Sequence, residues 1–354
     1  MSQKRLAYLD ALRGFTMILV VFAHVEGITF KVWPPTFLNE LFLLFRMPLF
    51  FFISGFIGYK ADLVWDRHVW WSLSSKKLLV QLLPTMILGT IYAYGYLHVS
   101  FGEFVMSKAK LGYWFTLVLL EMYLIVYTLN LLLYKSVPHA FKRWQLGALA
   151  LVSILFLSLV FILPSFTSQY SLGELLSLHS LFEYFPYFAF GCICAMDRAR
   201  FYRVLEHRYF TFVVIILFVG LFCVNRFFLY PNKGVGMVYY ASYHGISFIL
   251  GFLGLLIVFN IFRVYSGTFS SATRVGRSLQ YIGKRTLDIY LLHYFFLPYM
   301  PQLGSILFAE KNIAIELVVV GALSLVVVGL CLVVSNILRT SPILAKYLFG
   351  AKQD

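Results

Sequence analysis

Residues 8–24 read YLDALRGFTMILVVFAH, an apolar stretch that nevertheless carries Asp10, Arg13 and His24. On an α-helix Arg13 and His24 lie within roughly 20° of each other about the axis, and Asp10 lies one turn before Arg13 on much the same face. A charged or titratable side chain in hydrocarbon costs free energy, so such residues mark candidate functional sites. The stretch therefore predicts a membrane helix with a polar stripe.

The composition of the whole chain indicates that the rest of the protein is also embedded in the membrane. Of 354 residues 61% are hydrophobic and 12% are charged, whereas soluble domains carry about twice that share of charge. We predict an all-α polytopic membrane protein that forms a single domain over residues 1–354. The histidines never fall near cysteines or carboxylates at metal-ligand spacing, so no metal site is expected.

Segments of about 20 apolar residues are long enough to cross a bilayer. The sequence contains ten candidates, of which the sixth and ninth are interrupted by Pro186 and Pro298. They cover residues 11–30, 41–59, 78–98, 113–134, 145–163, 181–196, 209–230, 242–263, 287–308 and 313–337.

The number of lysine and arginine residues alternates strictly from high to low along the connecting segments. The two termini and every second loop hold 21 of them, and the remaining loops hold 5, namely Lys31, Lys108, Lys110, Lys233 and Lys311. Cytoplasmic loops collect such residues, so ten spans with both termini in the cytoplasm are predicted. The same bias accounts for most of the net charge of +14 without a nucleic-acid partner.

This topology assigns each intramembrane polar residue to one of two layers. The outer layer is predicted to contain His24, Arg46, Trp114, Glu121 and Arg226, and the inner layer Asp10, Arg13, Lys76, Lys77, Asp288, Tyr290 and His293. Such a distribution suits a cavity or tunnel across much of the bilayer. Other roles remain open, because an arginine near a helix end can snorkel to the interface and polar groups can simply join helices.

Four segments together resemble the acyltransferase 3 family of integral membrane acyltransferases, in its sugar O-acetylase-like branch. They are YLDALRGFTMILVVFAH (8–24), FRMPLFFFISGF (45–56), YWFTLVLLEMY (113–123) and IGKRTLDIYLLH (282–293). Ten helices is the usual number in that family. The family's R-x-x-R motif is not matched, since Lys77 and Val80 stand at its two arginine positions.

The resemblance implies transfer of an acyl group, typically acetyl, from cytoplasmic acyl-CoA to a hydroxyl of a cell-surface or lipid-linked glycan. It also implies a multi-pass protein of the bacterial cytoplasmic membrane, surrounded by lipid, with acyl-CoA as donor substrate and no permanently bound cofactor. A polytopic transporter or flippase is the alternative function. The lack of visible internal symmetry disfavours it, because many secondary transporters contain repeats.

Within this hypothesis His24 is the general base that takes the proton of the acceptor hydroxyl, since imidazole titrates near working pH. A covalent acyl-histidine is the other route. Arg13, held by Asp10, would engage the donor. Arg46 or Tyr290 would stabilise the oxyanion, and Ser54 is either a nucleophile or a small packing residue. Donor-binding candidates are Arg13, Lys76, Lys77, Tyr290 and His293, and acceptor-side candidates are Arg46, Trp114, Glu121 and Arg226.

Overall fold

The computed structural model describes residues 6–60, 63–162, 171–232, 234, 236–310 and 312–351. The described residues form helices, turns and connecting segments and contain no β-strand, which confirms the all-α class. Five basic residues counted in the loop comparison lie outside the described ranges, namely Lys4, Arg5, Lys233, Lys311 and Lys352.

Eight helical segments within the described ranges are long and apolar enough to cross a membrane. They match eight of the ten expected spans and confirm a polytopic membrane architecture. Their bounds are Ala7–Thr29, Phe37–Gly58, Arg67–Leu97, Trp114–Ser136, Pro138–Val160, Phe210–Asn232, Met237–Val264 and Ile313–Leu338.

The sixth and ninth expected spans differ from these eight. Residues 181–196 do lie in one helix, α10 (Leu178–Met196), which continues through Pro186, but His179 and Glu183 in its first turns lower its hydropathy. Residues 287–308 do not form a single helix. The chain has α16 (Thr286–Leu292), a 3₁₀ turn η6 (His293–Phe296) and, after an extended Leu297, α17 (Pro301–Leu307). Pro298 explains this break, because proline disfavours helical geometry in the residue before it.

The chain divides into two compact units, and the first contains residues 1–53 and 198–333. Its helices begin with α1 (Ala7–His24), extended by the π-helical turn η1 (Val25–Thr29), and the first part of α2 (Phe37–Gly58). The remaining elements are α11 (Arg198–Glu206), α12 (Phe210–Cys223), η5 (Val224–Leu229), α13 (Tyr230–Asn232), α14 (Met237–Val264), α15 (Arg274–Lys284), α16, η6, α17, α18 (Ile313–Ile315), η7 (Glu316–Val320) and most of α19 (Gly321–Leu338).

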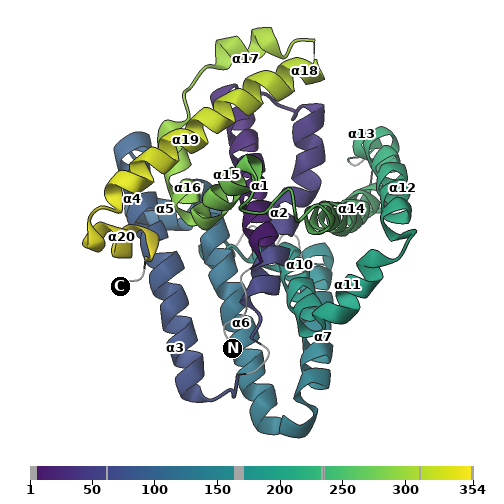
Figure 1. The fold of residues 1–354 in the computed structure, drawn as a ribbon. Coiled ribbons are helices and arrows are strands. Elements are labelled where there is room, and N and C mark those ends of the chain that lie inside the picture. Colours follow the sequence, from purple (N-terminus) through teal and green to yellow (C-terminus); the bar gives the residue numbers. More distant parts are fainter. Residues whose placement is uncertain are drawn as a thin grey trace. The chain divides into compact units, whose positions relative to one another are not determined.

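Helices α1 and α15 cross at very close range in the first unit (Figure 1). A Cβ added to Gly283 would overlap the Asp10 carbonyl, and one added to Gly14 would overlap the Leu279 carbonyl. Small residues permit such approach of two membrane helices and make it stable through packing. The crossing places Arg13 beside the start of α16, where the late polar motif begins.

The second unit contains residues 54–197 and 334–354. Helix α10 packs against α7 and α6, α3 packs against α6, and α20 packs against α4. Gly55 allows the end of α2 to touch the Phe188 carbonyl on α10, which supports the packing role of the Ser54–Gly55 pair. The elements of the second unit are α3 (Arg67–Lys77), η2 (Leu78–Leu82), α4 (Leu83–Leu97), α5 (Phe101–Met106), η3 (Lys108–Gly112), α6 (Trp114–Ser136), η4 (Pro138–Ala140), α7 (Phe141–Ile162), α9 (Ser171–Leu175), α10 and α20 (Pro342–Phe349).

Candidate functional site

A cluster of two histidines and a tyrosine lies at the end of α1. His24 Nδ1 lies 3.1 Å from His293 Nε2, and His24 Nε2 lies 3.1 Å from the Tyr294 hydroxyl. His293 is fully buried, whereas His24 is partly exposed. The two neighbouring residues reach His24 together because η6 replaces the α-helix at this point. His24 is therefore held at both ring nitrogens.

The hydrogen-bond partners define which nitrogen of His24 is basic. His293 Nδ1 lies 3.0 Å from the Ile289 carbonyl, which can only accept, so Nδ1 carries the proton of neutral His293. His293 Nε2 is then an acceptor and His24 Nδ1 is its donor. In neutral His24 this leaves Nε2 unprotonated, with the Tyr294 hydroxyl donating to it. The arrangement presents Nε2 as the proton-accepting atom, and a partner on the other nitrogen is how proteins fix a histidine tautomer.

The predicted donor residues on α1 lie near the close crossing with α15. Arg13 Nη2 donates a 2.8 Å hydrogen bond to the Thr286 hydroxyl at the start of α16. Asp10 is 4% exposed, and its carbonyl lies against Gly283. Thr286 was not among the predicted site residues, although it belongs to the IGKRTLDIYLLH segment. The structure thus joins the first and last of the four motif segments through this bond and through His24.

Sequence reasoning missed a pair of buried glutamates beyond His24. Glu26 is fully buried, and its two carboxylate oxygens accept from the Thr36 amide at 2.7 Å and from the Thr36 hydroxyl at 2.8 Å. The same hydroxyl makes a short hydrogen bond with Glu316, which is 2% exposed. The Thr36 hydroxyl therefore bridges the two carboxylates.

Arg46 is connected to this glutamate pair through Asn39. Arg46 Nη1 donates to Asn39 Oδ1 at 3.1 Å, and the backbone amide of Asn39 donates to Glu316 at 3.0 Å. Arg46 thus lies in one hydrogen-bonded chain with Glu316. Arg226 instead forms an ion pair with Glu40 at 3.0 Å and covers the ring of Tyr230. A signal for Glu26 and Glu316 was present in the sequence, because both are carboxylates at the ends of apolar segments.

The candidate residues of the second unit lie on α3 and α6. Lys77 places its ammonium 3.5 Å from the centre of the Tyr123 ring, a cation–π contact, while Lys76 is exposed. Trp114 stacks on Tyr184 of α10 with ring centres 5.6 Å apart. Both Glu121 carboxylate oxygens are buried and accept no hydrogen bond from the described residues.

Lys110, counted above among loop lysines, is 1% exposed. It donates to the Ser107 carbonyl at 3.3 Å and makes a short hydrogen bond to the Glu174 carbonyl. Its backbone and those of Ala109 and Leu111 adopt left-handed geometry, with φ of 48–53°, a conformation that costs free energy in residues other than glycine. Within the described ranges, histidine, cysteine and carboxylate side chains form no group of three that could hold a metal ion.

The structure corrects the predicted placement of His293. The sequence placed it in the inner layer with Arg13, on the assumption that residues 287–308 form one helix. The bond between Arg13 and Thr286 aligns the start of α16 with Arg13, and one α16 length further along His293 contacts His24, the residue assigned to the outer layer. Tyr290 is buried at 6% exposure one turn before it. No spacing within a single segment could have predicted a contact between residues 269 positions apart.

These observations define an integral membrane protein with an oriented histidine at the end of its first helix. The family model described as an acyltransferase domain matches residues 6–336, so the chain belongs to the acyltransferase 3 family and is an acyltransferase. The match runs through the sequence of both compact units. No curated protein and no solved structure matched the chain.

Proposed function

We propose that this protein transfers an acetyl group from acetyl-CoA to a hydroxyl of a cell-surface or lipid-linked glycan. The observation that supports it most strongly is the orientation of His24, whose Nε2 is left as a proton acceptor by the chain from His293 to the Ile289 carbonyl. The family membership supports the acyl-transfer class. The acetyl group, the CoA carrier, the glycan acceptor and a location in the bacterial cytoplasmic membrane are parts of the proposal.

In the proposed reaction the acceptor hydroxyl takes the place of the Tyr294 hydroxyl at His24 Nε2. Its oxygen attacks the thioester carbonyl carbon while His24 takes its proton. The carbon–sulfur bond then breaks, the new ester is released, and the CoA thiolate recovers the proton from His24. During the step His24 becomes a cation that donates from both nitrogens, and neutral His293 accepts from Nδ1 throughout. Direct transfer in this form requires no acyl-histidine.

The developing oxyanion needs a hydrogen-bond donor close to the base. Arg46 and Tyr290 were the sequence-based candidates. The Tyr294 hydroxyl is a better one, because it lies 3.1 Å from His24 Nε2 and loses that acceptor once the substrate hydroxyl binds there. We assign Tyr294 this role in the proposed mechanism.

On the donor side, we propose that Arg13 binds a phosphate or the pantetheine arm of CoA. Thr286 accepts a 2.8 Å hydrogen bond from one guanidinium nitrogen and so helps to position the guanidinium, which has five donors in a rigid fork. Lys76 and Lys77 are proposed to add positive charge for the donor. Trp114, Glu121 and Arg226 are proposed to lie on the acceptor side, since aromatic rings and carboxylates suit sugar faces and hydroxyls.

The test is release of CoA from acetyl-CoA by the purified full-length protein in lipid, with a mixture of glycan acceptors. We expect the wild type to release CoA and His24→Ala to lose release while it still binds acetyl-CoA. His139→Ala is the matched control, because His139 is an exposed histidine in the 3₁₀ turn η4, and it should retain full release.

Three results would contradict the proposal. Failure of folded wild-type protein to bind acetyl-CoA would exclude acetyl-CoA as the donor substrate. Movement of an intact glycan across the vesicle membrane without CoA release would favour the transporter alternative. Release that persists at the wild-type rate in His24→Ala would remove His24 from the chemistry.

A further inference from the structure

A second site lies away from the histidine cluster, at the corner where α11 meets the membrane span that starts with α12. The corner contains an open groove of about 730 Å³. One wall is basic and comes from α11 and the turn after it, and the other is apolar and comes from the first turns of α12. The lining residues are Arg200, Arg203, Val204, His207, Tyr209, Phe210, Val213, Val214 and Leu217.

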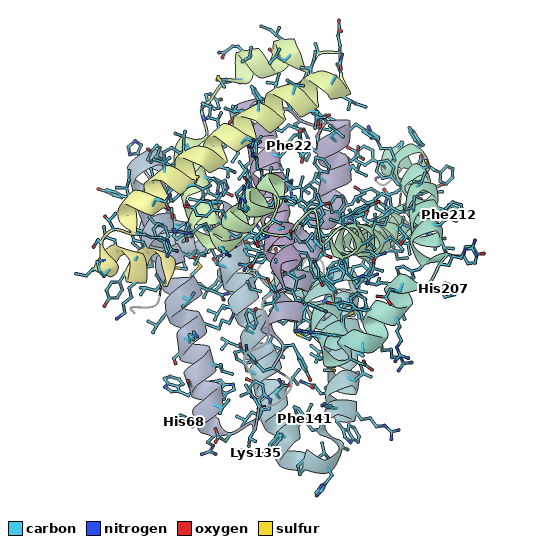
Figure 2. All side chains as sticks on the ribbon, viewed as in Figure 1. Phe22, His68, Lys135, Phe141, His207 and Phe212 are labelled. Atoms are coloured by element: carbon cyan, nitrogen blue, oxygen red, sulfur yellow. The ribbon has the colours of Figure 1, made fainter. Side chains whose placement is uncertain are left out.

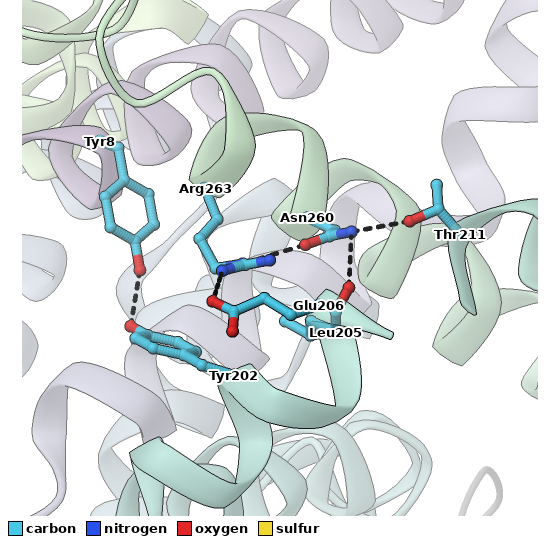
Figure 3. Close-up of polar contacts among 7 residues, drawn as sticks. All are labelled: Tyr8, Tyr202, Leu205, Glu206, Thr211, Asn260 and Arg263. Atoms are coloured by element: carbon cyan, nitrogen blue, oxygen red, sulfur yellow. Dashed lines mark hydrogen bonds and ion pairs between the residues drawn. The ribbon is translucent and has the colours of Figure 1, made fainter. Parts of the chain in front are cut away.

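The groove has a fixed shape because the opposite face of the corner is anchored to α1 and α14 (Figure 3). The Tyr202 and Tyr8 hydroxyls lie 2.7 Å apart, and Arg263 forms a 2.8 Å ion pair with Glu206. Asn260 donates to the Thr211 hydroxyl at 2.8 Å and accepts from Arg263 at 3.0 Å. These bonds attach both α11 and α12, the helices on either side of the turn, to α1 and α14.

The groove side carries positive charge from α11 and the turn after it. Residues 197–208 contain four arginines and two acidic residues. One of the acidic residues, Glu206, forms an ion pair with Arg263 of α14. Arg200 and Arg203 on α11 and His207 in the turn after it are exposed and line the groove. His207 and Phe212 both project outward near the turn (Figure 2). A ligand there meets at least two guanidinium groups.

The apolar wall belongs to a helix that crosses the membrane. Val213 and Leu217, one turn apart on α12, are 47% and 49% exposed, so a hydrocarbon chain can lie along them. The basic wall lies at the level where this span begins, which is where lipid headgroups are found. Basic pockets at the ends of membrane helices bind the phosphates of anionic lipids.

We propose that this corner is a binding site for one anionic phospholipid, with its phosphate between Arg200 and Arg203 and an acyl chain along Val213 and Leu217. Neither the acyl-transfer reaction nor its substrates are needed for this site. The predicted topology places it in the cytoplasmic leaflet, because the loop of residues 197–208 belongs to the basic set.

The test is native mass spectrometry of the full-length protein, with phosphatidylglycerol or phosphatidylcholine of identical chains added at equal concentration. We expect the wild type to retain one phosphatidylglycerol preferentially. The double variant Arg200→Gln/Arg203→Gln should lose that preference by about thirtyfold in affinity, since each interfacial cation contributes about fivefold. Arg200→Lys/Arg203→Lys keeps the charge and should retain most of the preference. Lys142→Gln/Arg143→Gln removes the same charge from an exposed basic segment elsewhere and should bind like the wild type.

Three outcomes would overturn the proposal. The first is equal retention of the two lipids by the wild type, and the second is an equal loss in the Lys142/Arg143 control. The third is displacement of the bound lipid by acetyl-CoA together with loss of acetyl-CoA binding in Arg200→Gln/Arg203→Gln, which would assign the groove to the donor. Because lipid retention is measured without acceptor or turnover, it succeeds or fails independently of the acyltransferase proposal.

Discussion

At the scale of single residues, the chemistry of this protein depends on how His24 is held. Its Nδ1 donates to His293, and its Nε2 accepts from Tyr294. The first bond selects the tautomer and the second protects the basic nitrogen until a substrate hydroxyl displaces it. A histidine with these two partners can serve as a base without a neighbouring carboxylate.

Replacing His293 tests the first of these bonds. We expect His293→Ala to lower the turnover number for CoA release by about a hundredfold or more, because general base catalysis contributes about 10² to 10⁴ and needs the correct tautomer. His293→Gln retains an acceptor oxygen for the Nδ1 proton and should keep more activity than His293→Ala. Equal loss in both variants, or none in either, would exclude this orienting role. Steady-state CoA release checks it, with acetyl-CoA affinity expected to stay unchanged.

Replacing Tyr294 tests the oxyanion role. Tyr294→Phe removes one hydroxyl and leaves the ring contacts with His24 and His293. We expect the turnover number to fall about 10² to 10³-fold, the usual effect of losing one oxyanion donor. The Michaelis constant for acetyl-CoA should change little. An unchanged turnover number would show that Tyr294 only occupies the resting site.

At the scale of the elements, the close crossing of α1 and α15 connects the donor and base regions. Asp10 and Arg13 lie on the part of α1 that touches α15, and His24 lies at its end. The glycine and the threonine of the IGKRTLDIYLLH segment therefore have a structural explanation. Its glycine lets the two backbones approach each other, and the threonine two residues after its lysine receives Arg13.

The crossing predicts a clear difference between two glycine-to-alanine changes. Gly283→Ala would place a methyl group on the Asp10 carbonyl and force the helices apart, at a cost of about 1–3 kcal/mol in the free energy of unfolding. Gly147→Ala lies in helix α7 with nothing within 4 Å of its added methyl group and should leave the stability unchanged or slightly raised. Thermal unfolding in detergent measures both, and a tolerated Gly283→Ala would contradict the close packing.

The Glu26–Glu316 pair joins η1, the connection before α2 and η7. Glu316→Ala would leave the amides of Leu38 and Asn39 without their carboxylate acceptor, at a cost of about 1–3 kcal/mol. Glu316→Gln keeps one oxygen that can accept from the Asn39 backbone amide and the Thr36 hydroxyl, and it loses only the longer 3.3 Å bond from the Leu38 amide, so it should be destabilised less than Glu316→Ala. The same unfolding measurement distinguishes them. Equal destabilisation would mean that the charge of Glu316, not its hydrogen-bond pattern, is essential.

At the scale of the whole molecule, the topology follows from charge. The alternation of basic loops predicts that the segments around residues 100 and 139 lie on opposite sides of the membrane. In intact cells a membrane-impermeant thiol reagent should label Gly102→Cys and should label His139→Cys only after permeabilisation. Both positions are exposed, and Cys223, the exposed natural cysteine, would first be replaced by alanine. The reverse pattern, or equal labelling of both sites, would contradict cytoplasmic termini.

The sequence by itself determined the class of this protein, because apolar length and low charge are properties of each segment taken alone. Eight of the ten expected spans, the polar stripe of Asp10, Arg13 and His24, and the family follow from local patterns. The break at Pro298 could also have been anticipated more firmly, since the preceding residue is restricted by the proline itself.

The tertiary structure alone decided which residues contact the polar side chains of the first helix and of the glutamate pair. His293 and Tyr294 meet His24 only after α16 ends and the chain turns, and Thr36 joins two glutamates that lie 290 residues apart. Sequence spacing gives the angle of a side chain about its own helix but not which other helix lies against that face. The packing of small residues such as Gly14 and Gly283 makes that choice, and with it the proton-accepting nitrogen of His24.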